Sequence, residues 1–499
     1  MTAAALLIPE TTADTTPEEL DAVVAAAVRA AGPSAAASDD ARAAWLEAVA
    51  DALDAARDEL VAIAERESHL PTLRLTGEVA RTTGQLRLFA AVVRDGAYLE
   101  AVIDRARPGA TPPQPDQRRI LRPLGPVAVF SASNFPFAFS VAGGDTASAL
   151  AVGCPVVVKG HSGHPELSVR TAQVVADALA SAGAPEGVFG LVLGRPAGNA
   201  LVQAPGIRAV GFTGSLSGGR ALFDLACARP DPIPFYGELG SINPVVVTPA
   251  AAKARTAEIA AGLAASFTLG VGQFCTKPGL VLVPAEAGFG TALAIEASSH
   301  RGGVMLTPRI AEAFPAGLRR LVVDGKADLL IGNPGQDASD GVARPAVLMA
   351  DAARVLARPE VLLEECFGPV TLLVRYASDA ERDAVLDAVG GSLTATVHAE
   401  PDEDVTELAA RLAERAGRVL FGGWPTGVAV TWSQHHGGPW PATTSALHTS
   451  VGATAVRRFQ RPVVFQDAPA SVLPEALRDD NPRSIVRRVD GKLTTAPLT

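Results

Sequence analysis

The clearest candidate for covalent chemistry is one cysteine held between small, uncharged residues in the stretch 267–279, FTLGVGQFCTKPG. Two glycines precede Cys275, and a threonine and a proline follow it. Glycines allow a carbonyl group to approach a thiol closely, and a nearby backbone N–H can stabilise the oxyanion that forms. A cysteine in an apolar run is more often a small buried hydrophobe. The loop composition and the motifs below favour Cys275 as a nucleophile.

Two further residues could assist this nucleophile. Glu238 lies in PFYGELGSINP among neutral residues, where burial would raise the pKa of its carboxyl group and suit it to general-base work near neutral pH. It could equally be a loop acid with backbone hydrogen bonds. Asn134, in SASNFPF, offers an amide donor that could serve an oxyanion or an ordinary Asx turn.

Other motifs could bind a nucleotide cofactor, although the sequence contains neither GxGxxG after a strand nor GxxxxGK[ST]. GFTGSLSGG places Gly214 and Ser215 where a strand turns into a helix, so backbone N–H groups could face a pyrophosphate, or form a plain turn. Lys159 ends the apolar run PVVVK, at the end of a strand where ligands bind, or is simply solvated. Glu365, in LLEECFGPV, could hold a ribose hydroxyl or face water.

The adjacent pair His435 and His436 lies in a long uncharged stretch. Neighbouring histidines with no third ligand nearby form a poor metal site, so we predict no metal. Residues 419–456 contain no Asp, Glu, Lys or Arg. The simplest interpretation is a long buried connection. A connection of this length is uncommon without a function, and we therefore interpret it, with its histidines, as the lining of a cavity.

The composition sets limits on the partners. The net charge is −10, with 48% hydrophobic and 19% charged residues, which argues against nucleic acid or an anionic membrane as the main partner. The four cysteines are far apart and form no CxxC pair, which indicates reduced thiols in a cytoplasm. The first residues lack the basic region of a signal peptide, and we expect a cytoplasmic protein.

Alternating strands and helices position these candidates. From residue 120 onward, short apolar runs alternate with helical segments, a pattern typical of a doubly wound parallel sheet. A second region of this kind spans residues 243–461, and the proline-rich segment 105–119 and the polar tail from Asp467 could form an arm. The N-terminal helices are interpreted as packing elements. The predicted strands are 126–131, 155–159, 187–193 and 207–213; the predicted helices are 17–31, 38–68, 78–104, 145–152, 165–183 and 214–228.

Taken together, these segments resemble the aldehyde dehydrogenase superfamily over nearly the whole chain. SNFPFAF, PVVVKG, GFTGS, ELGSINP, GQFCTKPG and EECFGPV occur in that family's order. The runs VAGGDTASALAVGCPVVVKGH and HGGPWPATTSALHTSVG are similar to a narrower group, the NADP-using α-ketoglutaric semialdehyde (2,5-dioxovalerate) dehydrogenases.

The resemblance implies an α/β fold with three parts. These are a Rossmann-like cofactor-binding domain (1–104 and 122–240), an α/β catalytic domain (241–461) and a small oligomerisation arm (105–121 and 462–499). It also implies a small-molecule aldehyde substrate and a homodimer or homotetramer.

The resemblance further implies a role for each candidate. Cys275 would attack the aldehyde, Asn134 and the Cys275 N–H would stabilise the oxyanion, and Glu238 would activate the water that hydrolyses the thioester. The residues implied to contact the cofactor are Lys159, Ser162, His161, Gly214, Ser215, Glu365 and Phe367.

Cofactor choice is predicted from one departure from the family's pattern. NAD-using relatives carry a glutamate three residues beyond the strand-end lysine, and here that position is Ser162. A carboxylate there would repel a 2′-phosphate. Its absence, with His161 beside Ser162 and Arg195 beyond the next strand, predicts NADP, and NAD is the alternative.

The substrate stays open between 2,5-dioxopentanoate and a medium- or long-chain aliphatic aldehyde, because the uncharged stretch offers no evident cation for a substrate carboxylate. A non-catalytic binding protein that kept the fold is the alternative from another class.

Overall fold

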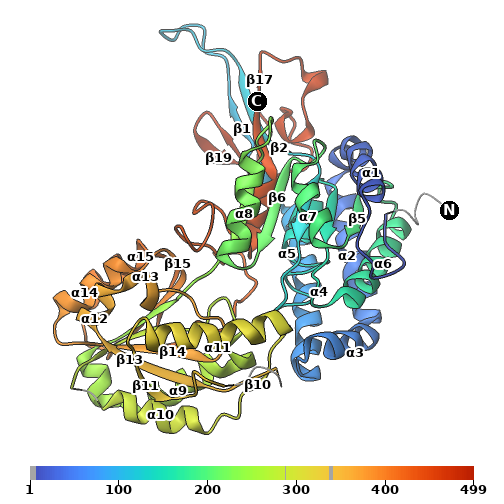
Figure 1. Cartoon of the computed structure of the whole chain (residues 1–499). Helices are drawn as coiled ribbons and strands as arrows, with labels where there is room; N and C mark the ends of the chain where they lie inside the picture. The colour runs from blue at the N-terminus through green and yellow to red at the C-terminus, as the bar shows by residue number, and fades with distance from the viewer. Residues whose placement is uncertain (1–6, 287, 337–340, 499) are drawn as a thin grey trace.

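The computed structural model describes residues 7–286, 288–336 and 341–498. Within these residues the chain forms a five-stranded parallel sheet, a seven-stranded sheet, a second five-stranded sheet and a two-stranded ribbon. Figure 1 shows the two larger units side by side, with the second five-stranded sheet projecting away from them. No helix among the described residues is long and apolar enough to cross a membrane.

The five-stranded parallel sheet has the order β5-β4-β3-β6-β7. The strand order reverses between β3 and β6, and doubly wound sheets leave a ligand-binding crevice at such a point, beyond the carboxyl ends of the strands. The structure confirms the four predicted strands and the helices between them, and adds β7. The elements are β3 (Val127–Phe130), α5 (Gly144–Ala151), β4 (Val156–Lys159), α6 (Pro165–Ser181), β5 (Phe189–Val192), α7 (Arg195–Gln203), β6 (Ala209–Thr213), α8 (Leu216–Cys227) and β7 (Phe235–Glu238).

Both faces of this sheet are buried, because successive side chains of each strand point to opposite sides. Val127 and Val129 pack with α5, α6 and the N-terminal helices, whereas Ala128 and Phe130 pack with α1 and α7 on the other face. The resulting strands are near-continuous apolar runs, as expected for a parallel sheet covered by helices.

The N-terminal helices differ from the prediction at two points. The segment predicted as one helix over 38–68 is divided at Ala56, which leaves the helical region (φ −89°, ψ 2°). The helix predicted over 78–104 ends at Asp95, because Gly96 adopts the left-handed conformation that ends helices, and strand β1 follows. The helices are α1 (Pro17–Ala36), α2 (Asp39–Ala55), α3 (Arg57–Ser68) and α4 (Thr72–Asp95).

The seven-stranded sheet has the order β11-β13-β14-β9-β8-β15-β16, and only the β11–β13 pair is antiparallel. Helices cover both of its faces. Its strands are β8 (Pro244–Val247), β9 (Leu280–Pro284), β11 (Asp328–Ile331), β13 (Ala346–Asp351), β14 (Val370–Tyr376), β15 (Ser392–His398) and β16 (Ala416–Phe421). Its helices are α9 (Pro249–Thr268), α10 (Phe289–Ser298), α11 (Pro308–Val323), α12 (Ala352–Ala357), α13 (Pro359–Leu362), α14 (Asp379–Ala388) and α15 (Thr406–Ala413). The ribbon pairs β10 (Gly303–Val304) with β12 (Val342–Ala343).

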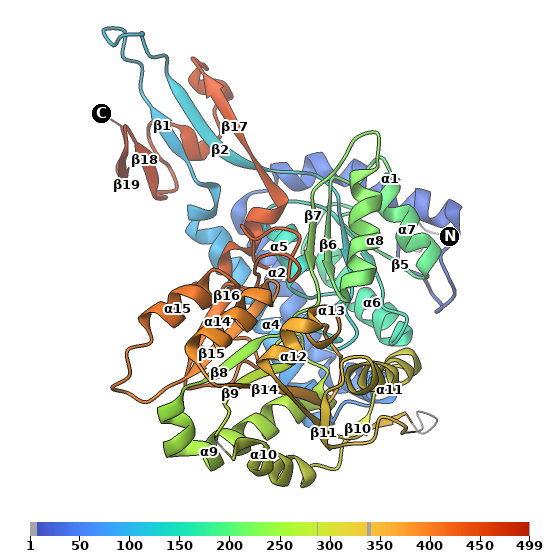
Figure 2. The ribbon, with the colours of Figure 1, turned by 60° about the vertical axis from the view of Figure 1, so that its left-hand side comes forward.

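The projecting sheet combines two distant parts of the chain (Figure 2). Its order is β17-β2-β1-β18-β19. Ile103 and Ile120 pack against Leu477 and Ile485 of the C-terminal segment in a small core, so the tail from Asp467 does have a core to join within one chain. The strands are β1 (Val102–Asp104), β2 (Gln117–Pro123), β17 (Gln460–Gln466), β18 (Arg487–Val489) and β19 (Lys492–Thr494).

A buried ion pair connects the C-terminal segment to the parallel sheet. Arg458 Nη1 lies 2.7 Å from Asp145 Oδ1, and the side chains are 3% and 10% exposed. Arg458 also donates to Ser148 Oγ and to the Ala455 carbonyl. The pair therefore fixes the chain entering β17 against α5.

We expect Asp145→Ala to lower the free energy of unfolding by about 3–5 kcal/mol, because it leaves a buried guanidinium without its partner. Thermal unfolding followed by circular dichroism measures this. The matched control is Asp224→Ala, which removes the exposed pair with Arg220 and should change stability little, because solvent screens that pair. Equal effects of the two substitutions would contradict the structural role of the Arg458–Asp145 pair.

Candidate active site

Cys275 lies in the connection from α9 to β9, in a loop with an unusual backbone. Gly270, Val271 and Gly272 all have positive φ (54°, 59° and 67°). A Cβ at Gly272 would lie 2.2 Å from the Gly368 carbonyl oxygen, so only glycine fits there. The glycines noted in the sequence thus allow the loop to pass against the 366–370 segment.

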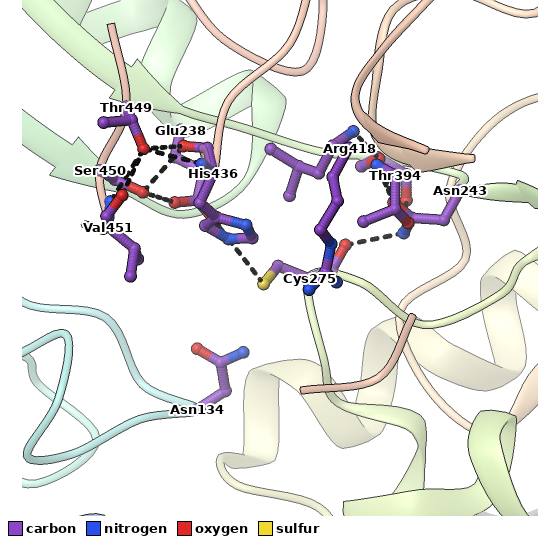
Figure 3. A network of polar contacts seen from close by, with 12 residues as sticks. Asn134, Glu238, Asn243, Cys275, Thr394, Arg418, His436, Thr449, Ser450 and Val451 are labelled. Carbon is purple, nitrogen blue, oxygen red and sulfur yellow. Dashed lines mark hydrogen bonds and ion pairs between the residues drawn. The ribbon is translucent and has the colours of Figure 1, made fainter. Parts of the chain in front are cut away.

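Polar side chains anchor this loop on both sides of the cysteine. Lys277 is 2% exposed, and its Nζ donates to the Cys366 and Val370 carbonyls at 2.9 Å each. Asn243 Nδ2 donates to the Cys275 carbonyl at 2.8 Å and to the Lys277 carbonyl at 3.0 Å (Figure 3). The backbone of the nucleophile is therefore held rigidly, and sequence reasoning missed both of these residues.

Glu238 is the last residue of β7 and is 3% exposed. Its Oε1 lies 2.9 Å from His436 Nε2, and its Oε2 accepts a hydrogen bond of 2.5 Å from Ser450 Oγ. Glu238 also pairs with Thr443 in an isolated antiparallel bridge. The uncharged stretch, which is irregular between β16 and residue 453, thus packs directly against the carboxylate.

His436 connects the carboxylate to the thiol. The same Nε2 atom lies 3.6 Å from Cys275 Sγ (Figure 3). The ring is 1% exposed and its centroid is 6.2 Å from that of Phe139. The expectation that the histidine pair lies near a cavity is met for His436, but the sequence did not indicate its contact with both Glu238 and Cys275.

The groups around Glu238 contradict the predicted direction of its pKa shift. Burial alone would raise the pKa of Glu238, but His436, Ser450 and Cys275 outweigh burial and hold that pKa below its ordinary value. The predicted raised pKa was therefore wrong, because the sequence did not reveal the donors around the carboxylate. Burial, and then the Glu238 charge, raise the pKa of the Cys275 thiol well above its ordinary value.

Asn134 reaches the same site from the loop after β3. It is 9% exposed, and its Nδ2 donates to the Gln273 carbonyl at 3.1 Å. An amide nitrogen carries two hydrogens, so one donor remains for another acceptor. Figure 3 shows the amide directed toward the region of Cys275 and His436. The structure thus brings Asn134, Glu238 and Cys275 together.

One atom each from Glu238, Cys275 and His436 lie within 4.8 Å of one another, a spacing that a metal ion could accept. The assumption that the histidines have no third ligand nearby was therefore wrong. An ion bound here would occupy the thiolate, and it would block covalent chemistry at sulfur.

Comparison with known proteins assigns the family. The aldehyde dehydrogenase family model matches residues 8–461. The alpha-ketoglutaric semialdehyde dehydrogenase 2 of Azospirillum brasilense is 50% identical over 461 residues, 91% of this chain and 87% of that protein. The chain belongs to the aldehyde dehydrogenase family. The alpha-ketoglutaric semialdehyde dehydrogenase of Acinetobacter baylyi is 42% identical over 467 residues, again 91% and 87% of the two chains.

Solved structures agree with this aldehyde dehydrogenase fold. A mutant of aldehyde dehydrogenase C from Pseudomonas syringae, in complex with NAD⁺ and octanal, has a TM-score of 0.77 at 22% identity and covers 92% of this chain and 91% of that one. A 1-pyrroline-5-carboxylate dehydrogenase from Thermus with bound NAD also has a TM-score of 0.77 at 22% identity, covering 91% and 86%. Membership of the aldehyde dehydrogenase family makes aldehyde oxidation with a nicotinamide dinucleotide the reaction class.

The residues expected to bind the dinucleotide lie mainly at the carboxyl edge of the parallel sheet. Lys159 ends β4, and burial lowers the pKa of its ammonium group. Ser215 is the N-cap of α8, and its Oγ accepts from the Gly218 N–H at 3.2 Å. Gly214 and Ser162 are exposed. An exposed helix N-terminus at this edge of the sheet fits an anionic pyrophosphate.

Two further residues for this role lie on the seven-stranded side. Burial raises the pKa of Glu365 to about 7, opposed by Lys277, and its Oε2 lies against Gly240, just beyond Glu238. Phe367 is half-buried two positions further along. Glu365 thus lies close to the connection between the two large sheets.

His161, expected beside Ser162 at the cofactor, lies in surroundings that keep its ring uncharged. Burial, with the charges of His164 and Lys159, lowers the pKa of its ring to about 3. Its Nδ1 accepts a hydrogen bond from the Gly163 N–H at 2.9 Å. His161 is therefore neutral near pH 7 and contributes no charge toward a phosphate. The exposed Arg195, at the start of α7, remains available.

Proposed function

We propose that this aldehyde dehydrogenase oxidises 2,5-dioxopentanoate (α-ketoglutaric semialdehyde) to 2-oxoglutarate through a thioester on Cys275. The observation that carries the chemistry is the contact of His436 Nε2 with both Cys275 Sγ, at 3.6 Å, and Glu238 Oε1, at 2.9 Å. The names of the two relatives at 50% and 42% identity support the substrate. Oxidation rates on 2,5-dioxopentanoate and hexanal distinguish this substrate from aliphatic aldehydes, and no reduced cofactor with any aldehyde would favour a binding protein.

The arrangement supports the following roles. The thiol is protonated at rest and releases its proton to solvent before it attacks, and the Nε2–H of His436, which donates to the ionised Glu238, lies where it can also stabilise the thiolate. Cys275 Sγ then attacks the aldehyde carbon, and the free donor of Asn134 and the Cys275 N–H stabilise the oxyanion. A bound nicotinamide dinucleotide supplies the hydride acceptor. Glu238 accepts a proton from the water that hydrolyses the thioester, which releases the carboxylate product and regenerates Cys275.

We predict that Glu238→Gln separates the two half-reactions. Loss of the carboxylate removes a charge that raises the Cys275 pKa, so thiolate formation and a first burst of reduced cofactor persist. Hydrolysis of the thioester slows by roughly 10²–10⁴-fold, the usual contribution of a general base. Stopped-flow absorbance measures both phases.

The control for this experiment is Cys275→Ala, which should give neither the burst nor the steady rate. If the burst and the steady rate fall together in Glu238→Gln, then Glu238 acts on the thiol instead of on water.

We also propose a preference for NADP. Ser162 is exposed just beyond Lys159 at the end of β4, and Arg195 is exposed beyond the neighbouring strand β5. A carboxylate at position 162 would face a 2′-phosphate with like charge, which costs on the order of a few kcal/mol at intermediate dielectric. The hydroxyl of Ser162 removes this repulsion.

Specificity constants for NADP and NAD test this preference. Wild type should favour NADP, and Ser162→Glu should shift the ratio toward NAD by about ten- to a hundredfold, the change that about 1.4–2.8 kcal/mol produces. Ser217→Glu, an exposed position on α8, controls for added charge alone. An unchanged ratio in Ser162→Glu would show that this position does not set cofactor choice.

We propose that the protein forms a homodimer or homotetramer through the projecting sheet. β17 and β16 are edge strands of their sheets, and such edges offer unpaired backbone groups. Val464 on β17 and Phe421 on β16 are 53% and 61% exposed.

Light scattering should give the mass of a dimer or tetramer for wild type and a smaller mass for Val464→Glu, because a buried charge would disfavour the interface. Val323→Glu, at another exposed valine, should assemble as wild type does. A monomeric wild type, or unchanged assembly of Val464→Glu, would contradict this interface.

A further inference from the structure

Helix α4 directs two arginines toward the nucleophile. Arg74, Glu78 and Arg81 are spaced by four and three residues, which places them on one face of the helix. Arg74 Nη2 donates to the Asn134 carbonyl at 2.6 Å, and its guanidinium lies 4.8 Å from the ring centroid of Phe274, the neighbour of Cys275. The sequence interpretation of this helix as a packing element did not anticipate these contacts near the nucleophile.

The second arginine lies near the catalytic charges. The Arg81 guanidinium lies 5.3 Å from the ring centroid of Phe139, the residue that packs against His436, and 5.4 Å from that of Phe135. Burial lowers the pKa of Arg81, and the charges of Glu78, Cys275 and Glu238 oppose this effect. Arg81 is thus within electrostatic reach of both catalytic groups.

Several guanidinium N–H groups here have no hydrogen-bond acceptor among the described residues. Among the described residues, Arg74 Nη1 and both Nε and Nη2 of Arg81 are buried without a hydrogen-bond partner. Glu78 does not satisfy them: its Oε1 accepts from the Phe137 and Ala138 N–H groups, and its Oε2 is itself unpartnered. Buried donors without partners are costly and rare, unless a ligand completes them.

A third arginine near the nucleophile comes from the seven-stranded sheet. Arg418, on β16, donates through Nη2 to the Pro425 and Gly427 carbonyls, and its Nε is buried without a partner. Figure 3 shows its side chain extending toward Cys275. Burial lowers the pKa of Arg418, and the Cys275 charge opposes this effect.

We infer that Arg81, with Arg74 on the same face of α4 and Arg418 of β16, binds the carboxylate end of a short dicarboxylic semialdehyde whose aldehyde carbon faces Cys275. The inference rests on the proposed function and names the residues that would select its substrate. A guanidinium offers a planar fork of donors that matches a carboxylate. The phenylalanine rings between Arg81 and Cys275 suit the methylene groups that join the two ends of such a molecule. These arginines supply the cation that the uncharged stretch lacks.

The test compares kcat/KM for 2,5-dioxopentanoate and hexanal, which share the reacting group and differ in the carboxylate. In Arg81→Gln, we expect the ratio of the two constants to fall about ten- to a hundredfold, the weight of a lost charge-assisted hydrogen bond, mostly through KM for the semialdehyde. Arg87→Gln is the matched control, because Arg87 is on the same helix but makes exposed ion pairs with Asp51 and Asp54, and its ratio should remain that of wild type.

An unchanged ratio in Arg81→Gln, with both substrates slowed equally, would overturn the inference and assign Arg81 to the thiol instead. A second measurement separates this inference from the proposed substrate. 2-Oxoglutarate should inhibit hexanal oxidation in competition with the aldehyde, and Arg81→Gln, but not Arg87→Gln, should raise its inhibition constant by a similar factor. Wild type that is inhibited in this way but does not oxidise 2,5-dioxopentanoate would refute the proposed substrate alone, and no inhibition would refute the carboxylate site.

Discussion

A carboxylate and a thiol lie within contact distance of one imidazole nitrogen, in a site from which most water is excluded. An isolated buried carboxylate would take up a proton, because the charged form loses its hydration. His436 and Ser450 provide donors that keep Glu238 ionised. The thiol has the opposite balance, since burial and the Glu238 charge both favour its protonated form. His436, placed between them, is therefore the residue on which the proposed chemistry depends.

The fold brings these groups together from separate units. Glu238 ends the last strand of the parallel sheet, Cys275 precedes a central strand of the seven-stranded sheet, and His436 and Ser450 belong to the irregular chain that packs over both. Asn243, in the short connection between the sheets, holds the backbone of the nucleophile. The distances among catalytic atoms consequently depend on how the two large sheets are joined, and not on any single loop.

Many of the strands and two of the site residues could be predicted from the sequence, because short runs of neighbouring residues indicate them. The strands ending at Phe130 and Lys159 are short, continuous apolar runs followed by turn residues, and the structure confirms them. The division at Ala56 was not predictable in the same way, because alanine favours a helix and no glycine or proline marks the break. Cys275 and Glu238 were conspicuous because their neighbours are uncharged.

The roles of His436, Lys277 and Arg81 were not evident, for a different reason. Each depends on contacts between segments far apart in the chain, and the local patterns suggest something simpler: a poor metal pair, a polar loop residue and a solvated helix face. The prediction of a raised pKa for Glu238 was wrong for the same reason, since the hydrogen-bond donors that lower this pKa are 198 and 212 residues away in sequence.

That separation has a consequence for the order in which the chain becomes competent during synthesis. Domains fold largely as the ribosome releases them, from the N-terminal end. The parallel sheet and the loop with Cys275 are complete long before residue 450 emerges. Until then Glu238 has neither His436 nor Ser450, and the thiol lacks its imidazole neighbour. The nascent enzyme thus carries its nucleophile in an unassembled site, and reactivity arises only when the segment with His436 and Ser450 has been made and packs against Glu238.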